Sequence, residues 1–223
     1  EKLLDINYLM SIKKELDLSL KGKSQMKLPK FIYPIIEIVY QLQNNPYAPY
    51  VGRVIFQKIA YIFTQMINDN ELNFKESHYG PYSDILNKSL NILANSNIIL
   101  EEKYNGLYRI KVLDDYIAVR EKHKDQIEAF SDKLEKIVDL FTRIKDTEQA
   151  EEVATVLYTS KKLKQNGNPV KETDLLNAIY SWKKSWNKED KTARLVNTIR
   201  NLTALHWINT IYCPELKGSN DFI

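Results

Sequence analysis

The carboxylates of Asp146, Glu148, Glu151 and Glu152 form the densest acidic cluster in the sequence. Two carboxylates serve as general acid and general base when both face one reacting bond. Neighbouring residues of a helix point about 100° apart, so the adjacent Glu151 and Glu152 do not make such a pair. The same geometry applies to the other adjacent pairs, which are Glu101-Glu102, Asp114-Asp115 and Glu189-Asp190. We therefore expect solvated acidic faces rather than an acid–base centre.

The sequence offers no other recognisable motif for catalysis or cofactor binding. Its six glycines are scattered and include no G-x-G pair, so a phosphate-binding loop is not expected. None of His78, His123 and His206 lies three or four residues from another His or Cys, the spacing typical of metal ligands. No Ser, Thr or Cys lies in a known nucleophile motif. We expect no enzymatic activity, no cofactor and no metal.

Composition favours a globular protein of a reducing compartment. The chain has 223 residues, of which 43% are hydrophobic and 27% charged, and this length can bury a sizeable core. Cys213 is the only cysteine, which excludes an internal disulfide framework. No apolar run approaches the roughly 20 residues needed to cross a bilayer, and no basic-then-apolar leader opens the sequence. We expect a cytoplasmic protein that does not bind a membrane, and the first residue, Glu1, leads us to expect a piece of a longer chain.

The distribution of charge argues against a reader of duplex DNA. The formal net charge is +3, and the excess lies in residues 1–30, where seven Lys accompany four acidic residues. Residues 31–112 hold seven Lys or Arg against seven Asp or Glu. Non-specific affinity for nucleic acid comes mainly from Lys and Arg that contact phosphates. An electrically neutral module is therefore not expected to bind duplex DNA.

Apolar residues at helical spacing predict the first elements. Residues 5–20 have an amphipathic helical pattern, and the polar stretch 21–27 is typical of a linker. The apolar stretch 31–44 predicts the next helix, which cannot continue through the prolines and glycine of 44–52. The apolar stripe of residues 55–66 predicts a further helix.

Residues 82–96 predict the third helix of the main body, directly after the aromatic and turn-forming stretch of residues 78–81. We expect Gly80-Pro81 to form the corner before this helix, with Pro81 at or near its first position. Asn105-Gly106 between alternating residues predicts a β-hairpin, because a type I′ turn needs two positive-φ positions. Three helices followed by a hairpin are typical of a winged helix-turn-helix.

Helical patterns dominate the sequence after residue 114. Apolar spacing predicts helices at 134–144, 172–187 and 190–207. Asp146 to Gln149 resembles a capping box, which predicts a helix that ends near 166–169. The predicted fold is mainly α, with an N-terminal helix and linker (1–27), a winged-helix-like module of three helices plus a β-hairpin (28–113), and a helical bundle module (114–223).

Protein binding is the function class that remains best supported. Tyr79, Tyr82, Trp182, Trp186 and Trp207 are aromatic residues of the kind enriched at interface hot spots. Trp182 and Trp186 lie on the apolar stripe of a predicted helix, so we expect them in the core. Tyr79 and Tyr82 flank a turn, so we expect them at the surface. A winged-helix DNA-binding regulator and a structural arm of a larger enzyme stay open as alternatives.

Several segments together resemble one protein family. They are PKFIYPIIEIVYQLQNNPYAPYVGRVIFQKIAYIFTQ (29–65), HYGPYSDIL (78–86), FTRIKDTEQAEEVATVLYTSKKL (141–163), and AIYSWKKSW with TIRNLTALHWI (178–208). The elements F-Q-K-x-x-Y, Y-G-P-Y and S-W-K-K-S-W occur in the family's order, and the likeness covers about residues 28–212. On these residues, the chain resembles the carboxy-terminal region of macrodomain-containing antitoxins of the DarT/DarG type.

The resemblance implies a function and a partner. In that family, an amino-terminal macrodomain removes ADP-ribose from DNA. The carboxy-terminal domain separately binds and blocks DarT, a toxin that ADP-ribosylates single-stranded DNA. We expect the macrodomain in the same full-length chain, outside the present sequence, and we expect no glycohydrolase activity from these residues.

Two ways of blocking such a toxin stay open. In the first, carboxylates and aromatic rings occupy the toxin's basic groove where phosphates and bases would lie. The candidate toxin-binding residues are Tyr79, Tyr82, Asp84, Asp146, Glu148, Glu151 and Glu152. In the second, the domain covers the toxin's active site sterically. The sequence as a whole is not acidic, so any mimicry of DNA would be local.

Overall fold

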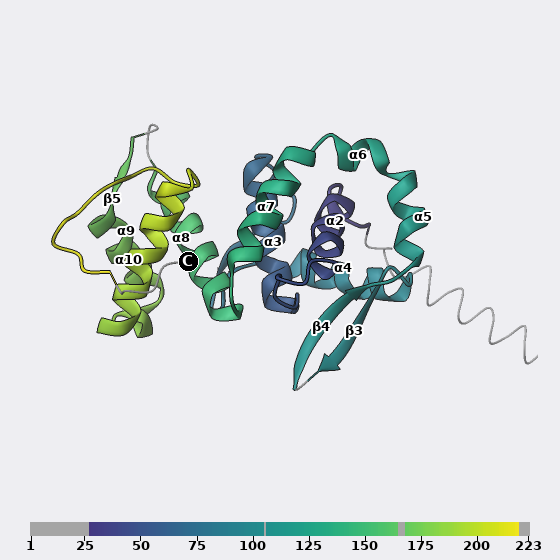
Figure 1. Cartoon of the computed structure of the whole chain (residues 1–223), viewed down its shortest axis with the longest axis horizontal. Helices are drawn as coiled ribbons and strands as arrows, with labels where there is room; N and C mark the ends of the chain where they lie inside the picture. Colours follow the sequence, from purple (N-terminus) through teal and green to yellow (C-terminus); the bar gives the residue numbers. More distant parts are fainter. Residues whose placement is uncertain (1–26, 105, 165–167, 219–223) are drawn as a thin grey trace, which may run out of the picture.

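The computed structural model describes residues 27–104, 106–164 and 168–218, and this part of the chain is mainly helical, as predicted (Figure 1). The helix predicted at residues 5–20 lies outside the described residues, as does all of the predicted linker except Lys27. No helix in the described ranges combines the length and the apolar character that a membrane span requires.

The described elements are mostly helices, joined by a few short strands. The helices are α2 (Ile32–Gln43), α3 (Arg53–Met66), α4 (Asp84–Asn95), α5 (Asp115–Lys122), α6 (Lys124–Glu128), α7 (Ser131–Arg143), α8 (Thr147–Leu163), α9 (Glu172–Trp182) and α10 (Glu189–Ala204). The strands are β1 (Lys75–Ser77), β2 (Gly80–Tyr82), β3 (Ile99–Tyr104), β4 (Leu107–Val112), β5 (Val170–Lys171) and β6 (Thr210–Ile211). β1 pairs with β2 and β3 with β4 in antiparallel fashion, whereas β5 and β6 pair in parallel.

In the first half of the described chain, α2, α3, the β1–β2 hairpin and α4 precede the predicted β3–β4 hairpin, which is confirmed. Strands β3 and β4 pair in register from Ile99 opposite Val112 to Tyr104 opposite Leu107. Gly106 between the two strands has φ +82°, a conformation that glycine adopts without steric cost. The side-chain amide of Gln43 donates to the carbonyl of Val112 at 3.1 Å and accepts from its N–H at 2.7 Å. These bonds fix the base of the hairpin against the end of α2.

The expected helix start at Gly80-Pro81 is wrong. Pro81 lies in strand β2, and α4 begins only at Asp84. The hydroxyl of Ser83 accepts a hydrogen bond from the N–H of Leu86 at 3.1 Å and so caps the helix. A serine oxygen satisfies a helix N–H that would otherwise lack a partner, which a proline ring cannot do. The cap at Ser83 therefore sets the start of α4.

Helices α5, α6 and α7 form an arch around α2 and α3 (Figure 1). α7 packs against both α2 and α3, and α6 packs against α2. The ring of Phe130 lies edge-on to those of Phe31 and Phe63, with 5.5 Å between centroids in each pair. Residues before and after the predicted boundary at 113/114 thus share one hydrophobic core. The division into modules at that boundary stays a prediction.

Helix α8 connects this body to the group formed with α9 and α10 (Figure 1). It packs against α3 and β2 as well as against α9 and α10. The predicted capping box is confirmed at its start, where Asp146 Oδ1 accepts from the N–H of Gln149 at 2.8 Å. The side chain of Gln149 reaches back to the N–H of Lys145, one residue before the capping position, at 2.7 Å.

Candidate functional site

Two buried polar side chains of α3 hold the β1–β2 hairpin in place. Gln57 Nε2 donates to the carbonyl of Ser83 at 3.0 Å, and Gln57 Oε1 accepts from the Ser83 N–H at 2.9 Å. The ammonium of Lys58 donates to the carbonyl of Pro81 at 2.8 Å. Both side chains are almost fully buried, so these bonds form away from water. The F-Q-K segment thereby fixes the backbone of the Y-G-P-Y corner.

Lys58 is an unusual residue for this buried position. Removal from water lowers the pKa of Lys58 to about 7, because burial disfavours the charged form. The carboxylate of Glu151 opposes this shift, whereas the ammonium of Lys183 adds to it. Gly80 has φ +85° and packs closely against Lys58 and Thr155. A Cβ at Gly80 would lie 3.4 Å from Lys58 Nζ and 3.1 Å from Thr155 Oγ1. Glycine therefore permits both the turn and the close approach.

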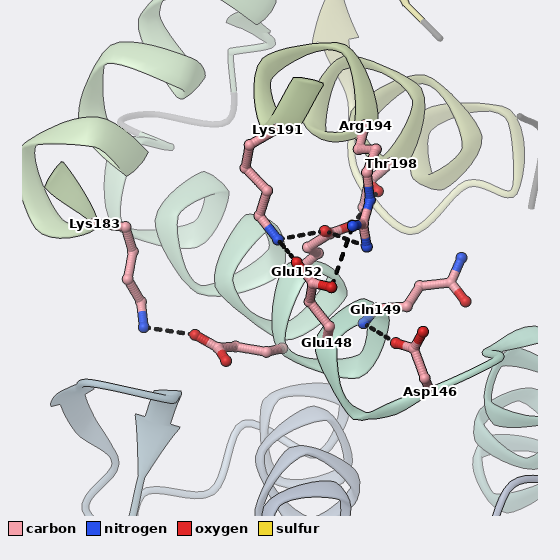
Figure 2. Close-up of polar contacts among 9 residues, drawn as sticks. Asp146, Glu148, Gln149, Glu152, Lys183, Lys191, Arg194 and Thr198 are labelled. Atoms are coloured by element: carbon pink, nitrogen blue, oxygen red, sulfur yellow. Dashed lines mark hydrogen bonds and ion pairs between the residues drawn. The ribbon is translucent and has the colours of Figure 1, made fainter. Parts of the chain in front are cut away.

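Lys183 ties three segments of the chain together. Its ammonium donates to Glu151 Oε1 of α8 at 2.7 Å and also to the carbonyl of His78 in the β1–β2 turn. Figure 2 shows Lys183 reaching towards α8 from the α9 side. The ammonium also lies 5.1 Å from the ring centroids of Trp182 and Trp186. Aromatic faces attract cations, so the rings add to the ion pair that holds Lys183.

The predicted position of Trp186 on the helix of Trp182 is wrong. α9 ends at Trp182, and Trp186 lies in a short 3-10 turn over Lys184–Trp186. Both tryptophans are half-buried rather than fully enclosed in the core. A second lysine, Lys191 of α10, lies 4.3 Å from the ring centroid of Trp186. The ring of Trp186 thus contacts two lysines that are themselves anchored on α8.

A cleft of about 680 Å³ opens between the β1–β2 hairpin and the turn after α9. It is lined by residues 76–79, Glu151 and residues 182–186, and we name it the Tyr79 cleft. The side chain of Tyr79 is 58% exposed at its edge. The cleft combines half-buried aromatic rings with charged groups, of which Glu76, Glu151 and Lys183 are already paired, and this is a composition suited to binding.

Two residues of the acidic cluster, Glu148 and Glu152, are neutralised by α10 (Figure 2). Lys191 Nζ lies 2.7 Å from Glu148 Oε1 and 2.5 Å from Glu152 Oε1. Arg194 contacts the same carboxylates at 3.2 Å and 2.9 Å. The hydrogen bond from Lys191 lowers the pKa of Glu148, whereas burial raises the pKa of Glu152. Two cations face two carboxylates, so these carboxylates add no excess negative charge.

The structure places two of the seven predicted site residues at the Tyr79 cleft. Tyr79 and Glu151 both line the Tyr79 cleft. The other five lie outside it: Tyr82 half-buried at the end of β2, Asp84 exposed at the start of α4, Asp146 as the cap of α8, and Glu148 and Glu152 facing α10. The predicted exposure of Tyr79 is confirmed, whereas Tyr82 is only partly exposed.

Sequence reasoning missed the lysines that organise the cleft. Lys58 and Lys183 lie inside helical or aromatic stretches, where a lysine usually points to solvent. A signal was present in SWKKSW, where two tryptophans four residues apart enclose two lysines, a pattern that favours contact between cation and ring. In α3, Gln57 and Lys58 interrupt an apolar run and are buried together with it.

Within the described ranges, no group of three or more His, Cys, Asp or Glu side chains could hold a metal ion. Comparisons with known proteins give no further guide, since no protein-family model matches the chain and no curated protein matches its sequence.

Proposed function

We propose that this chain is an antitoxin domain that binds a DarT-type DNA ADP-ribosyltransferase and blocks it. The observation that carries the proposal is the meeting of three segments at the Tyr79 cleft. Residues 78–86, 141–163 and 178–186, which carry the resemblance to the DarG-type antitoxins, all contribute to its lining. The fourth, residues 29–65, supplies the Lys58 contact beneath it. On this proposal the chain acts by binding without turnover, in the cytoplasm, and a macrodomain belongs to the same full-length protein.

The contacts around α8 favour steric covering over mimicry of DNA. A phosphate mimic must present carboxylates to the basic groove of its partner. Glu148, Glu151 and Glu152 instead bind Lys183, Lys191 and Arg194 of the same chain. Tyr79 is exposed and bears no charge, which suits an aromatic side chain that inserts into a pocket of the toxin.

We further propose that α2–α4 and β3–β4 form a winged-helix-like module that serves as the scaffold of the antitoxin. In such modules, the third helix reads DNA, and here that helix is α4. Its exposed face includes Asp84 and Lys88, whose charges cancel, together with Asn91 and Asn95. The alternative function, a DNA-binding regulator, predicts strongly salt-dependent affinity for duplex DNA, which can be measured directly.

Coexpression of this chain with a DarT-like toxin tests the proposal. We expect rescue of growth and a stable complex of the two purified proteins. Tyr79→Ala should weaken the complex at least about tenfold, as expected for a hot-spot residue. Tyr47→Ala, which truncates an 83% exposed tyrosine of the 44–52 loop, is the matched control and should leave affinity unchanged.

Failure of both rescue and complex formation would refute the antitoxin function. Equal affinity of the Tyr79 variant and the parent would place the toxin surface elsewhere. Charge reversal at Glu148 or Glu151 is a poorer test, because it removes partners of Lys183, Lys191 and Arg194 inside the fold.

A further inference from the structure

A second concave region lies along the carboxyl end of α8. It consists of two hollows of about 340 Å³ and about 270 Å³, whose linings share Tyr61, Gln65 and Lys161. A hydrogen bond from Lys161 Nζ to Gln65 Oε1 joins two of these shared residues. We name the two hollows together the α8 trough. Lys162 of the trough pairs with Glu76 of the Tyr79 cleft at 2.8 Å, so the two regions are neighbours.

Aromatic rings line both hollows of the trough. Trp207 lines the first, Phe74 and Tyr158 line the second, and Tyr61 lines both. The ring centroid of Tyr61 lies 5.3 Å from that of Phe74 and 5.7 Å from that of Tyr158. Tyr61 is buried, whereas Trp207, Phe74 and Tyr158 are half-buried and remain partly accessible. Such rings provide surfaces on which a planar aromatic ligand can stack.

Exposed lysines surround these rings. Lys161, Lys162 and Lys164 come from the end of α8, and Lys136 of α7 lies 4.6 Å from the ring centroid of Trp207. Among the described residues that line the two hollows, Asp69 is the acidic one. Lys162 is paired with Glu76, so Lys136, Lys161 and Lys164 supply the excess positive charge of the trough.

Compensation of the helix dipole does not account for the whole arrangement. Lysines in a last turn are favourable because the carboxyl end of a helix carries partial negative charge. This effect explains Lys161 and Lys162 on α8. It does not explain Lys136, which comes from another helix and lies over Trp207, or the aromatic lining beside it.

We propose that the α8 trough binds nucleotide units of single-stranded nucleic acid, with one base in each hollow and the linking phosphate at Lys161. Lys161 lines both hollows, and each hollow has an aromatic lining. A cation between two aromatic surfaces matches the alternation of phosphates and bases along a strand. Binders of single strands combine a basic groove with stacking aromatic side chains in this way. A duplex does not fit, because its bases are stacked on one another. The proposal goes beyond toxin inhibition and does not depend on it.

Fluorescence anisotropy with a labelled oligothymidylate of about 12 nucleotides tests the site in the intact chain. The trough variant is K136A/K161A/K164A, and its control K88A/K103A/K111A removes the same charge from exposed positions on α4 and the β3–β4 hairpin. On a strand of this length Lys136 and Lys164 are expected to contact phosphates that flank the one at Lys161. Loss of all three contacts should reduce the dependence of log affinity on log salt concentration by about 2 and weaken binding at least about tenfold. The control should bind as the parent does.

Unlabelled competitors identify the source of the ligand. If a strand is the ligand, unlabelled oligothymidylate and a thymidine dinucleotide displace the labelled oligothymidylate far better than thymidine monophosphate does. Equal displacement by the monophosphate would contradict strand binding and would show that the hollows bind a free nucleotide. Absence of binding, or equal loss in both variants, would overturn the site itself.

Photo-crosslinking keeps the test independent of variant folding. A strand that carries 4-thiothymidine should crosslink to the parent chain within residues 157–164 or 207–209. Crosslinks confined to α4 or to the β3–β4 hairpin would contradict the proposal and would favour the DNA-regulator alternative.

Discussion

The ammonium of Lys183 lies 2.7 Å from a carboxylate oxygen of Glu151, and the two side chains are only 6% and 12% exposed. This ion pair holds the turn after α9 against α8, and the second bond of Lys183, to His78, adds the β1–β2 hairpin. Three separate segments of the chain therefore meet at one nearly buried charge. The contact thus links the two walls of the Tyr79 cleft.

Truncation of one partner should destabilise the fold strongly. Glu151→Leu leaves the Lys183 ammonium buried without its counter-ion, which costs about 3 kcal/mol or more in free energy of unfolding. The double variant E151L/K183M should recover much of this loss, because no unpaired charge remains. Urea unfolding of the parent, both single variants and the double variant measures the coupling.

The exposed ion pair of Lys124 and Glu128 provides the control for that cycle. Its atoms are 3.8 Å apart and both side chains are more than half exposed. Lys124→Ala should change the free energy of unfolding by less than about 1 kcal/mol. A similarly small effect of Glu151→Leu would show that Lys183 does not depend on the carboxylate.

Stability should rise with pH because of Lys58. Its pKa is about 7 in the folded chain and 10.5 in the unfolded chain. Between these two values the unfolded chain binds more protons, so the free energy of unfolding increases as pH rises through this window. Lys58→Met removes the group and should flatten the profile between about pH 7 and 10.5.

Lys88→Met, at an exposed position of α4, is the matched control for Lys58→Met. The informative quantity is the difference between parent and variant, since tyrosines and other lysines titrate in the same range. A Lys58→Met profile parallel to that of the parent would mean that Lys58 is not shifted. The reverse sign, a parent that loses stability with rising pH relative to the variant, would mean that the buried ammonium is charged and stabilising.

Local signals allowed much of the fold to be predicted. Helices α2 and α3 and the β3–β4 hairpin follow from apolar spacing and from Asn105-Gly106, which depend on residues close in sequence. The capping box at Asp146 is equally local and is confirmed. The start of α4 was misplaced because Gln57, 26 residues away, holds Ser83 in the capping position.

The candidate site was predicted less well because its contacts are long-range. Glu151 and Lys183 are separated by 32 residues, and Lys183 and His78 by 105. Composition shows that both signs of charge are present but not which carboxylate meets which lysine. The acidic cluster of α8 therefore looked like an exposed surface, whereas Lys191 and Arg194 of α10 neutralise its Glu148 and Glu152.

Gly80 should tolerate alanine less well than Gly106. Both have positive φ, so Ala is strained by about 1 kcal/mol at either position. A Cβ at Gly106 meets nothing within 4 Å, whereas one at Gly80 meets Thr155 and Lys58 at 3.1–3.4 Å. Gly80→Ala should therefore lower the free energy of unfolding by more than Gly106→Ala does. Equal effects in thermal or urea unfolding would mean that the hairpin shifts without cost.

Two substitutions of Asp146 distinguish a structural role of this residue from a role in partner binding. Its side chain caps α8, so Asp146→Ala should lower the free energy of unfolding by about 1 kcal/mol. Asp146→Asn keeps an oxygen that can accept from the Gln149 N–H and should be nearly as stable as the parent, although it removes the negative charge. If Asp146 acts only as a cap, the Asn variant also keeps full affinity for a DarT-type toxin in a titration. Loss of affinity in the stable Asn variant would instead restore local charge mimicry at the start of α8, since the carboxylate alone distinguishes the two side chains.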